Sequence, residues 1–328
     1  MGGVMRRRTF LAYSVFSGVA CSRRGPGSLR KLRIGAPLAL GTAALYLGEE
    51  LGYFREAGFE TEITTFERVT EATTALAGGK LEVLLASHSP SWMNAIVRGV
   101  PIRVVAAREK MSPACRRMAF LAALKSMYPD GLGDLRVLKG KRIIVGGGTG
   151  TLQFALTQHL ATAGLTLDDV VTVNLTGPDA MAALFSGSVE AMMVFDDSLL
   201  PDRRPELVFS RGFAELHPNY QYGLILFGAE LRQEDPRTGR GFLKAYFRGV
   251  RDFVQGGTPK FLKEFADYRG VDAQRMELVC RDNYVMDGRI DPESLRLFAE
   301  WAFRRGYLTR QVEVSELIDP RFLVPSAA

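Results

Sequence analysis

The sequence has few of the residues that build metal and redox sites. Its 328 residues include three cysteines, three histidines and two tryptophans. The histidines, His88, His159 and His217, are dispersed, and none has ligand-like spacing with a cysteine. We therefore expect neither a bound metal nor a cofactor.

The sequence also lacks a basic, aromatic-rich stretch and, after its first twenty residues, a membrane-spanning segment. Its formal net charge is nevertheless +6. No run of Lys and Arg is interleaved with aromatic residues, and residues 6–8, which are all arginine, supply three of the positive charges. Nucleic acid is therefore not an expected partner. No segment after the first twenty residues is long and apolar enough to cross a bilayer. With 47% hydrophobic and 24% charged residues, the composition is that of a globular protein.

The first residues read as an export signal. A basic start precedes an apolar stretch over 10–20, which is too short to span a membrane and suits a signal-peptide core. The stretch Arg7-Arg8-Thr9-Phe10-Leu11 resembles a twin-arginine motif, and a Sec-type signal is the alternative. We predict a signal peptide over 1–20, a tether over 21–30, and an exported protein of the periplasm or cell envelope.

Small residues at Gly18 and Ala20 fit cleavage before Cys21, which is also a candidate for lipidation. Gly18 departs from the Leu usual in lipoproteins, so a soluble and a lipid-anchored mature protein both remain open. Export places Cys115 and Cys280 in an oxidising compartment, where a disulfide is one alternative. Because sequence cannot supply the geometry that a disulfide needs, we expect two buried free thiols.

One pattern occurs twice. "ALAGGKLEVLLAS" ends at Ser87 and "ALFSGSVEAMMVF" ends at Phe195, each as helix, glycine turn and buried strand. Both lie in series of aliphatic strands and amphipathic helices, which indicate a parallel sheet covered on both faces. Two similar apolar strands, "MAFLAALKS" and "YGLILFGAE", each follow a completed series where the chain would cross between lobes.

We predict an α/β fold of two similar, doubly wound, mainly parallel sheets with a ligand cleft between them. Lobe 1 would contain 31–111 and 221–328, and lobe 2 would contain 112–220.

Several blocks carry a family resemblance over residues 32–255. They are "LRIGAPLALGTAALYLGEELGYFREAGFETEI", "ALAGGKLEVLLAS", "LKGKRIIVGGGTGT" and "SVEAMMVF". In this order they resemble solute-binding proteins of ABC transporters, in the branch that binds nitrate, sulfonates, taurine and thiamine precursors. Glu82 and Glu190 stand where that family usually has Asp. The resemblance implies a type II periplasmic-binding-protein fold and a non-enzymatic monomer that delivers a small molecule to an ABC permease. A thiamine-pyrimidine-synthase-like enzyme and a sensory binding protein are the alternatives.

In open α/β sheets, ligands bind beyond the carboxyl ends of the strands, against helix N-termini. The loops there offer backbone N–H groups, hydroxyls, an anion-binding arginine, aromatic faces and one carboxylate. The candidate ligand-binding residues are Gly41, Thr42, Arg68, Ser87, His88, Ser89, Trp92, Gly148, Thr149, Gly150, Thr151, Phe195, Asp196, Tyr220 and Tyr222. The glycine loop and Arg68 favour an anion such as a sulfonate or nitrate. Asp196 and the aromatic residues favour a flat nitrogen heterocycle such as a thiamine pyrimidine precursor.

Overall fold

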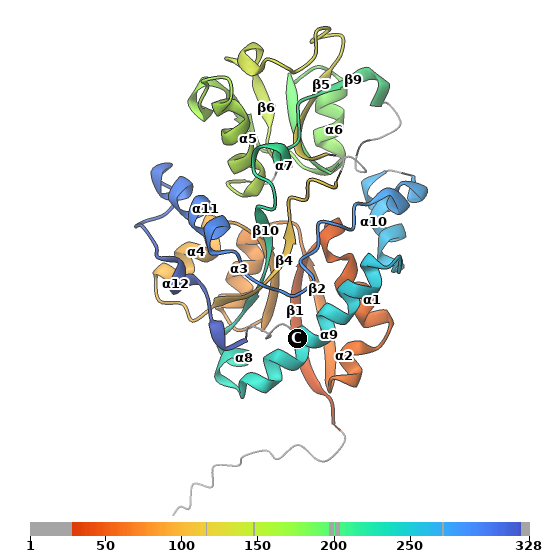
Figure 1. The fold of residues 1–328 in the computed structure, drawn as a ribbon, viewed down its shortest axis with the longest axis vertical. Helices are drawn as coiled ribbons and strands as arrows, with labels where there is room; N and C mark the ends of the chain where they lie inside the picture. Colours follow the sequence, from red (N-terminus) through yellow and green to blue (C-terminus); the bar gives the residue numbers. More distant parts are fainter. Residues whose placement is uncertain are drawn as a thin grey trace, which may run out of the picture.

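Two five-stranded sheets, one above the other in Figure 1, form the frame of the molecule. The computed structural model describes residues 28–322 apart from 116, 147, 197–199, 201–203 and 271. The predicted signal peptide, tether and Cys21 lie outside the described residues. The first sheet has the order β2 (Phe59–Phe66), β1 (Arg30–Pro37), β3 (Val83–Ser87), β10 (Gln221–Phe227) and β4 (Arg103–Lys110). The second has the order β7 (Val171–Val173), β6 (Arg142–Ile144), β8 (Ala191–Asp196), β5 (Met118–Leu124) and β9 (Leu207–Phe209).

The two sheets repeat one topology, which explains the repeated pattern in the sequence. The two repeats end in β3 and β8, each the third strand of its sheet, parallel to one neighbour and antiparallel to the other. The predicted α/β fold of two similar sheets is confirmed. The sheets are mixed rather than mainly parallel, however, because β10 and β5 run antiparallel to both of their neighbours. Each enters from the other lobe at the edge where the parallel strands end, so it must run in the opposite direction.

The glutamates of the repeat have the same structural role in both sheets. Glu82 and Glu190 each precede the repeated strand, and each accepts a hydrogen bond from a backbone N–H of the adjoining strand. The donors are Arg33 N, at 3.2 Å, and Arg142 N, at 2.9 Å. In return, the Glu82 and Glu190 amides donate to the Arg33 and Arg142 carbonyls. The acidic position therefore fixes strand register and lies away from the cleft.

Helices cover both faces of the sheets. Figure 1 shows α1, α2 and α9 on one side of the first sheet and α3, α4, α11 and α12 on the other. No helix in the described part of the chain has the length and apolar character of a membrane span. The helices are α1 (Ala43–Glu50), α2 (Tyr53–Glu56), α3 (Val69–Ala77), α4 (Pro90–Val97), α5 (Thr151–Ala161), α6 (Gly177–Phe185), α7 (Phe213–Leu216), α8 (Ala229–Gln233), α9 (Pro236–Val254), α10 (Phe261–Arg269), α11 (Pro292–Arg304) and α12 (Val314–Leu317).

Helix α11 connects the two lobes. It packs on α4 and β10, while the Trp301 indole N–H donates to Thr157 Oγ1 of α5 at 3.0 Å. Arg305, just past its end, pairs with Asp168 at 2.9 Å. Accordingly, a single cluster of buried hydrophobic residues includes side chains from β3 and α4 of lobe 1 and from β5 and α5 of lobe 2. The predicted lobe 1 includes the C-terminal helices, and α11 packs on α4, α12 and β10 of that lobe while also contacting lobe 2.

A disulfide links Cys115 to Cys280, so the expectation of two free thiols is wrong. Cys115 lies in the segment that crosses from β4 to β5, and Cys280 lies in the segment between α10 and α11. The two residues are 165 positions apart in the chain, and only the folded arrangement brings their Cα atoms to 5.5 Å. The bridge therefore fastens the C-terminal region to the crossing between the lobes.

Candidate functional site

The repeated strands end at a cleft between the two sheets. Ser87, at the end of β3, and Phe195, near the end of β8, line two cavities that share these residues as walls. The first chamber, of about 180 Å³, also contains Arg108, Glu109 and Asp196. The second chamber, of about 390 Å³, also contains His88, Ser89, Ser91 and the glycine loop 148–152. Both chambers take residues from both sheets, as expected for a ligand held between two lobes.

A buried ion pair forms the floor of the first chamber. Arg108 Nη1 lies 2.6 Å from Glu109 Oε2, and both side chains are at most 3% exposed. The Arg108 guanidinium also donates to the Gly41 carbonyl, and the Tyr222 hydroxyl donates to Glu109 Oε1 at 3.2 Å. Asn283 Nδ2 in turn donates to the Tyr222 oxygen at 3.2 Å. Burial of a charge is costly unless it is paired and hydrogen-bonded, and this network supplies part of the bonding that the two charges need.

A β-bulge brings the two charges together. Neighbouring residues of a strand normally point to opposite faces of its sheet. Glu109 pairs with Gly223, whereas the next residue of β10, Leu224, pairs with Ala107, so Arg108 is the extra residue of β4. A bulge of this kind turns a side chain toward a site. It explains how adjacent Arg and Glu side chains both line one chamber.

Two glycines make room for the Glu109 carboxylate. A Cβ atom added at Gly41 would lie 2.0 Å from Glu109 Oε1, and one added at Gly223 would lie 2.5 Å from Oε2. Any other residue at either position would displace the carboxylate. Gly41 was predicted to present its N–H to a ligand. In the structure it also has a second role, because its carbonyl accepts a hydrogen bond from Arg108 and its lack of a side chain leaves room for the Glu109 carboxylate.

The first chamber contains more acceptors than donors. Asp196 enters from β8 and is 7% exposed, so two carboxyl groups face one guanidinium. Burial raises the pKa of Glu109, and the nearby Asp196 adds to this, while Arg108 and Tyr222 act in the opposite direction. Among the described residues, Asn283 Oδ1 and Arg108 Nε have no hydrogen-bond partner although both are buried. The chamber therefore suits a molecule that donates several hydrogen bonds and accepts one.

The second chamber is lined by loops that begin helices. Ser87, His88, Ser89 and residues 148–151, all predicted as site residues, meet there. Ser89 caps α4 by accepting the Ser91 N–H at 3.2 Å. The carbonyl of His88 lies so close to Gly150 that a Cβ atom there would be 3.2 Å away. The glycine loop of lobe 2 thus closes against the β3–α4 loop of lobe 1.

His88 is held as a neutral imidazole. Its Nδ1 lies 2.7 Å from the Tyr220 hydroxyl, and its ring packs on Phe298 at a centroid distance of 4.9 Å. Burial lowers the pKa of His88 to about 3. Because it has no charge at neutral pH, His88 serves to position the β3–α4 loop and offers no fixed charge to a ligand.

Four predicted residues lie elsewhere. Trp92 is fully buried, and its indole N–H donates to the Ser87 carbonyl at 3.0 Å, so it supports the cleft from the core and offers no stacking face. Thr42 is also fully buried, and its hydroxyl donates to the Ala39 carbonyl at 2.6 Å. Tyr220 belongs to the aromatic core beside His88. Arg68 is exposed, and none of the cavities described here includes it.

Phe195 and Tyr222 take the aromatic role that Trp92 was expected to have. Their rings meet edge to face at a centroid distance of 4.9 Å, and both line the first chamber. Sequence reasoning missed Arg108, Glu109 and Asn283. The available signal was "AAREK", where a charged pair ends an apolar strand, since charge at that place is expensive without a partner or a ligand.

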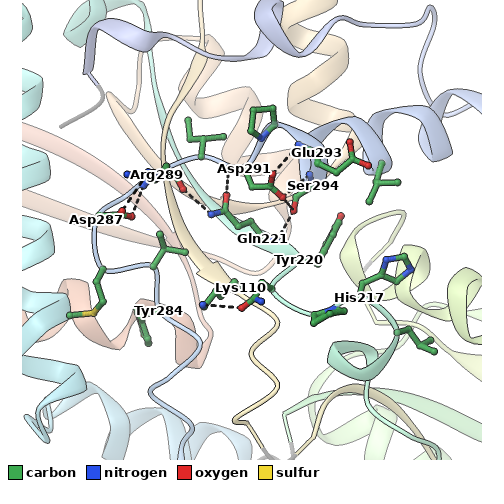
Figure 2. Close-up of a pocket in the computed structure, with 18 residues that line it drawn as sticks. Lys110, His217, Tyr220, Gln221, Tyr284, Asp287, Arg289, Asp291, Glu293 and Ser294 are labelled. Atoms are coloured by element: carbon green, nitrogen blue, oxygen red, sulfur yellow. Dashed lines mark hydrogen bonds and ion pairs between the residues drawn. The ribbon is translucent and has the colours of Figure 1, made fainter. Parts of the chain in front are cut away.

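A third hollow, larger than either chamber, lies outside the crossing strands, and Figure 2 shows hydrogen bonds between several of its polar groups. It has a volume of about 780 Å³. Lys110 Nζ donates to Asn219 Oδ1 at 3.0 Å. Gln221 donates to the Arg289 carbonyl at 2.8 Å and accepts the Asp291 N–H at 2.6 Å. These bonds fasten the 283–294 segment to β10, so we assign this hollow a structural role.

Comparisons with known proteins agree with this architecture. A family model described as NMT1/THI5 like matches residues 41–260. A search of curated proteins finds no match. The aliphatic sulphonate-binding protein SsuA of Escherichia coli is 15% identical with a TM-score of 0.69, over 92% of this chain and 96% of that one. SsuA of Xanthomonas axonopodis pv. citri, bound to MOPS, is 18% identical with a TM-score of 0.69, over 88% and 98%.

The nitrate-binding protein NrtA of Synechocystis PCC 6803 has a TM-score of 0.70 at 12% identity, over 90% of this chain and 87% of that one. At these identities the likeness demonstrates a shared fold and leaves the ligand open.

Proposed function

Because the chain belongs to the NMT1/THI5-like family, we propose that it is an exported solute-binding protein that passes a small organic molecule to an ABC transporter permease. The solute binds between lobe 1, over 31–111 and 221–328, and lobe 2, over 112–220. Closure of the lobes buries it, and the closed form is the one that the permease recognises. The protein acts as a monomer and needs no cofactor.

The observation that carries the proposal is the buried charge at the junction of the two sheets. Arg108 and Glu109 come from β4 of the first sheet, and Asp196 comes from β8 of the second. Charged groups at such a boundary are expensive to bury, and a ligand that meets their remaining hydrogen-bonding capacity offsets that cost. The same ligand would contact both lobes and thereby favour the closed form.

The size and chemistry of the first chamber favour a nitrogen heterocycle. A cavity of roughly 150 Å³ accommodates one benzene ring, and the first chamber has about 180 Å³. The two N–H bonds of one ring amino group would donate to Glu109 and Asp196, while a ring nitrogen would accept from Arg108. An aminopyrimidine has this pattern. A simple anion such as nitrate would face two carboxyl groups against one guanidinium.

Native mass spectrometry of the gently purified mature protein tests the proposal. We expect one solute bound at 1:1 stoichiometry, released unchanged on denaturation. Loss of uptake of that solute on deletion of the gene would separate transport from a sensory role. A solute that is converted on the protein would favour the enzyme alternative.

Export is tested separately. Arg7→Lys together with Arg8→Lys should retain the precursor in the cytoplasm if the twin-arginine route is used. Unchanged export would leave the Sec route. Cys21→Ala should release the protein from membranes only if Cys21 is lipidated, which cell fractionation followed by immunoblotting measures.

A further inference from the structure

Helix α9 carries a row of basic side chains on its outer face. Its opposite face, which includes Phe242, Tyr246 and Phe253, is buried in the core of lobe 1 and holds the helix in place. The basic residues recur at intervals of three and four positions, which places them along one side of the helix. They form the basic stripe, which consists of Arg237, Arg240, Lys244, Arg248 and Arg251. From the rise of a helix per residue, the stripe is about 21 Å long.

More than half of the stripe's basic groups are not neutralised by an ion pair. Arg237 pairs with Asp235, and Arg248 pairs with Glu56, each at 2.6 Å. Within the described part of the chain, no ion pair involves the other members of the stripe, Arg240, Lys244 and Arg251.

The surroundings of the stripe leave it a positive surplus that faces solvent. Lys244 and Arg251 are exposed, and the half-buried Arg240 donates to the neutral carbonyl of Arg321 at 2.8 Å. Asp252, on the same helix, is a third carboxylate beside the stripe, and it accepts a hydrogen bond from the Tyr53 hydroxyl. Five basic groups against these three carboxylates make the outer face of α9 a surface for an anionic partner.

The chain enters the fold beside the beginning of the stripe. Arg30, at the start of β1, pairs at 2.6 Å with Glu234, which lies two residues before α9 begins. In Figure 1, α9 and the start of β1 lie in the lower half of the molecule, and lobe 2 lies at the opposite end. A ten-residue tether over 21–30 reaches at most about 35 Å when fully extended. A lipid on Cys21 would therefore hold this end of lobe 1 near the membrane.

We propose that the basic stripe docks on an anionic membrane surface, with lobe 1 against the lipid headgroups and lobe 2 directed away from them. The inference rests on the proposed export of the protein and requires no particular solute. Lysine and arginine are attracted to an anionic leaflet when they lie within a Debye length of it. The described linings of the two chambers include no residue of α9, so docking engages neither of them. The protein would thus stay at the surface in which its permease lies.

Sedimentation of the mature protein with lipid vesicles tests the docking. We expect binding to phosphatidylcholine vesicles that contain phosphatidylglycerol, and none to pure phosphatidylcholine. Raising the salt from about 0.15 M to about 1 M should release the protein, because the Debye length falls from about 8 Å to about 3 Å. One basic residue near an anionic surface contributes about fivefold in affinity. The combined variant Arg240→Gln, Lys244→Gln and Arg251→Gln should therefore bind about a hundredfold more weakly.

A second triple variant is the matched control. Lys125→Gln, Lys139→Gln and Lys141→Gln remove the same number of positive charges from exposed positions of lobe 2. This variant should bind the anionic vesicles within about twofold of the wild type, because screening confines the attraction to about 8 Å from the surface. Both variants keep the arginines at positions 23 and 24 of the tether, so a difference between them reports on the stripe.

Three results would overturn the inference. They are equal binding of the wild type to the two kinds of vesicle, equal weakening in the stripe variant and the control, and binding to heparin without binding to the anionic vesicles. Native mass spectrometry separates these outcomes from the proposed function, since the stripe variant should still contain its solute at 1:1 stoichiometry. A wild type that contains its solute but does not bind anionic vesicles would refute the docking and leave the proposed function intact.

Discussion

The Glu109 carboxylate sits in the tightest packing of the site, and Gly41→Ala is the smallest change that disturbs it. The new Cβ would lie 2.0 Å from Oε1 and 2.5 Å from Cδ. The carboxylate cannot move away freely, because Gly223 lies against Oε2 and Arg108 is 2.6 Å away. The ion pair must therefore shift or separate.

The expected cost follows from those two possibilities. Overpacking of a well-packed site costs about 1–3 kcal/mol, and separation of a buried ion pair costs about 3–5 kcal/mol. We expect Gly41→Ala to lower the free energy of unfolding by an amount within this span. It should also weaken binding of the co-purified solute at least tenfold, because Glu109 and Arg108 are displaced.

Urea unfolding with a matched Gly→Ala control measures the effect. At Gly241, in helix α9, the nearest atom to an added Cβ is 3.8 Å away. Alanine there should raise stability by about 0.5–1 kcal/mol, because glycine is unfavourable inside a helix. If Gly41→Ala is as stable as the wild type and binds the solute equally well, the described packing around Glu109 is wrong.

Three other predictions concern the cleft and its supports. Asp196→Ala should weaken a heterocyclic solute by roughly ten- to hundredfold in calorimetric titration, since a buried hydrogen bond to a charged group contributes about 1.5–3 kcal/mol; neutral or tighter binding would instead identify a purely anionic solute. Cys115→Ser with Cys280→Ser should cost about 2–5 kcal/mol in chemical unfolding, and an unchanged midpoint would show that the bridge does not constrain the fold. Because burial lowers the pKa of His88 from 6.5 to about 3 in the folded protein, its contribution to stability is complete above pH 6.5 and is lost as the pH falls toward 3. That loss amounts to about 2 kcal/mol between pH 7 and pH 5, and His88→Gln should remove it; equal slopes in the two proteins would contradict the buried neutral imidazole.

The sequence predicted the repeated units well because their signal is local. A helix, a glycine turn and an apolar strand are all set by neighbouring residues, and the pattern ending at Ser87 and Phe195 identified equivalent strands of the two sheets. The sequence did not reveal that the two crossing strands, β10 and β5, run antiparallel to their neighbours. An apolar strand reads the same in parallel and antiparallel pairing, and only the point where β10 and β5 enter their sheets decides it.

The burial and the contacts of individual side chains could not be predicted from the sequence either. Trp92 follows the β3 strand closely enough to suggest a cleft position, but its indole turns back to the Ser87 carbonyl and lies in the core. The Arg108–Glu109 pair depends on a bulge set by the register against Gly223, which no local pattern reveals. The Cys115–Cys280 bridge likewise depends on the final placement of distant segments.

A crystal structure of the mature protein purified with its own solute tests the central claim most directly. The account predicts one solute between the two sheets, with nitrogen donors within hydrogen-bond distance of Glu109 and Asp196 and its ring beside Phe195 and Tyr222. Electron density for the solute in the hollow outside the crossing strands, with the first chamber filled only by water, would contradict it.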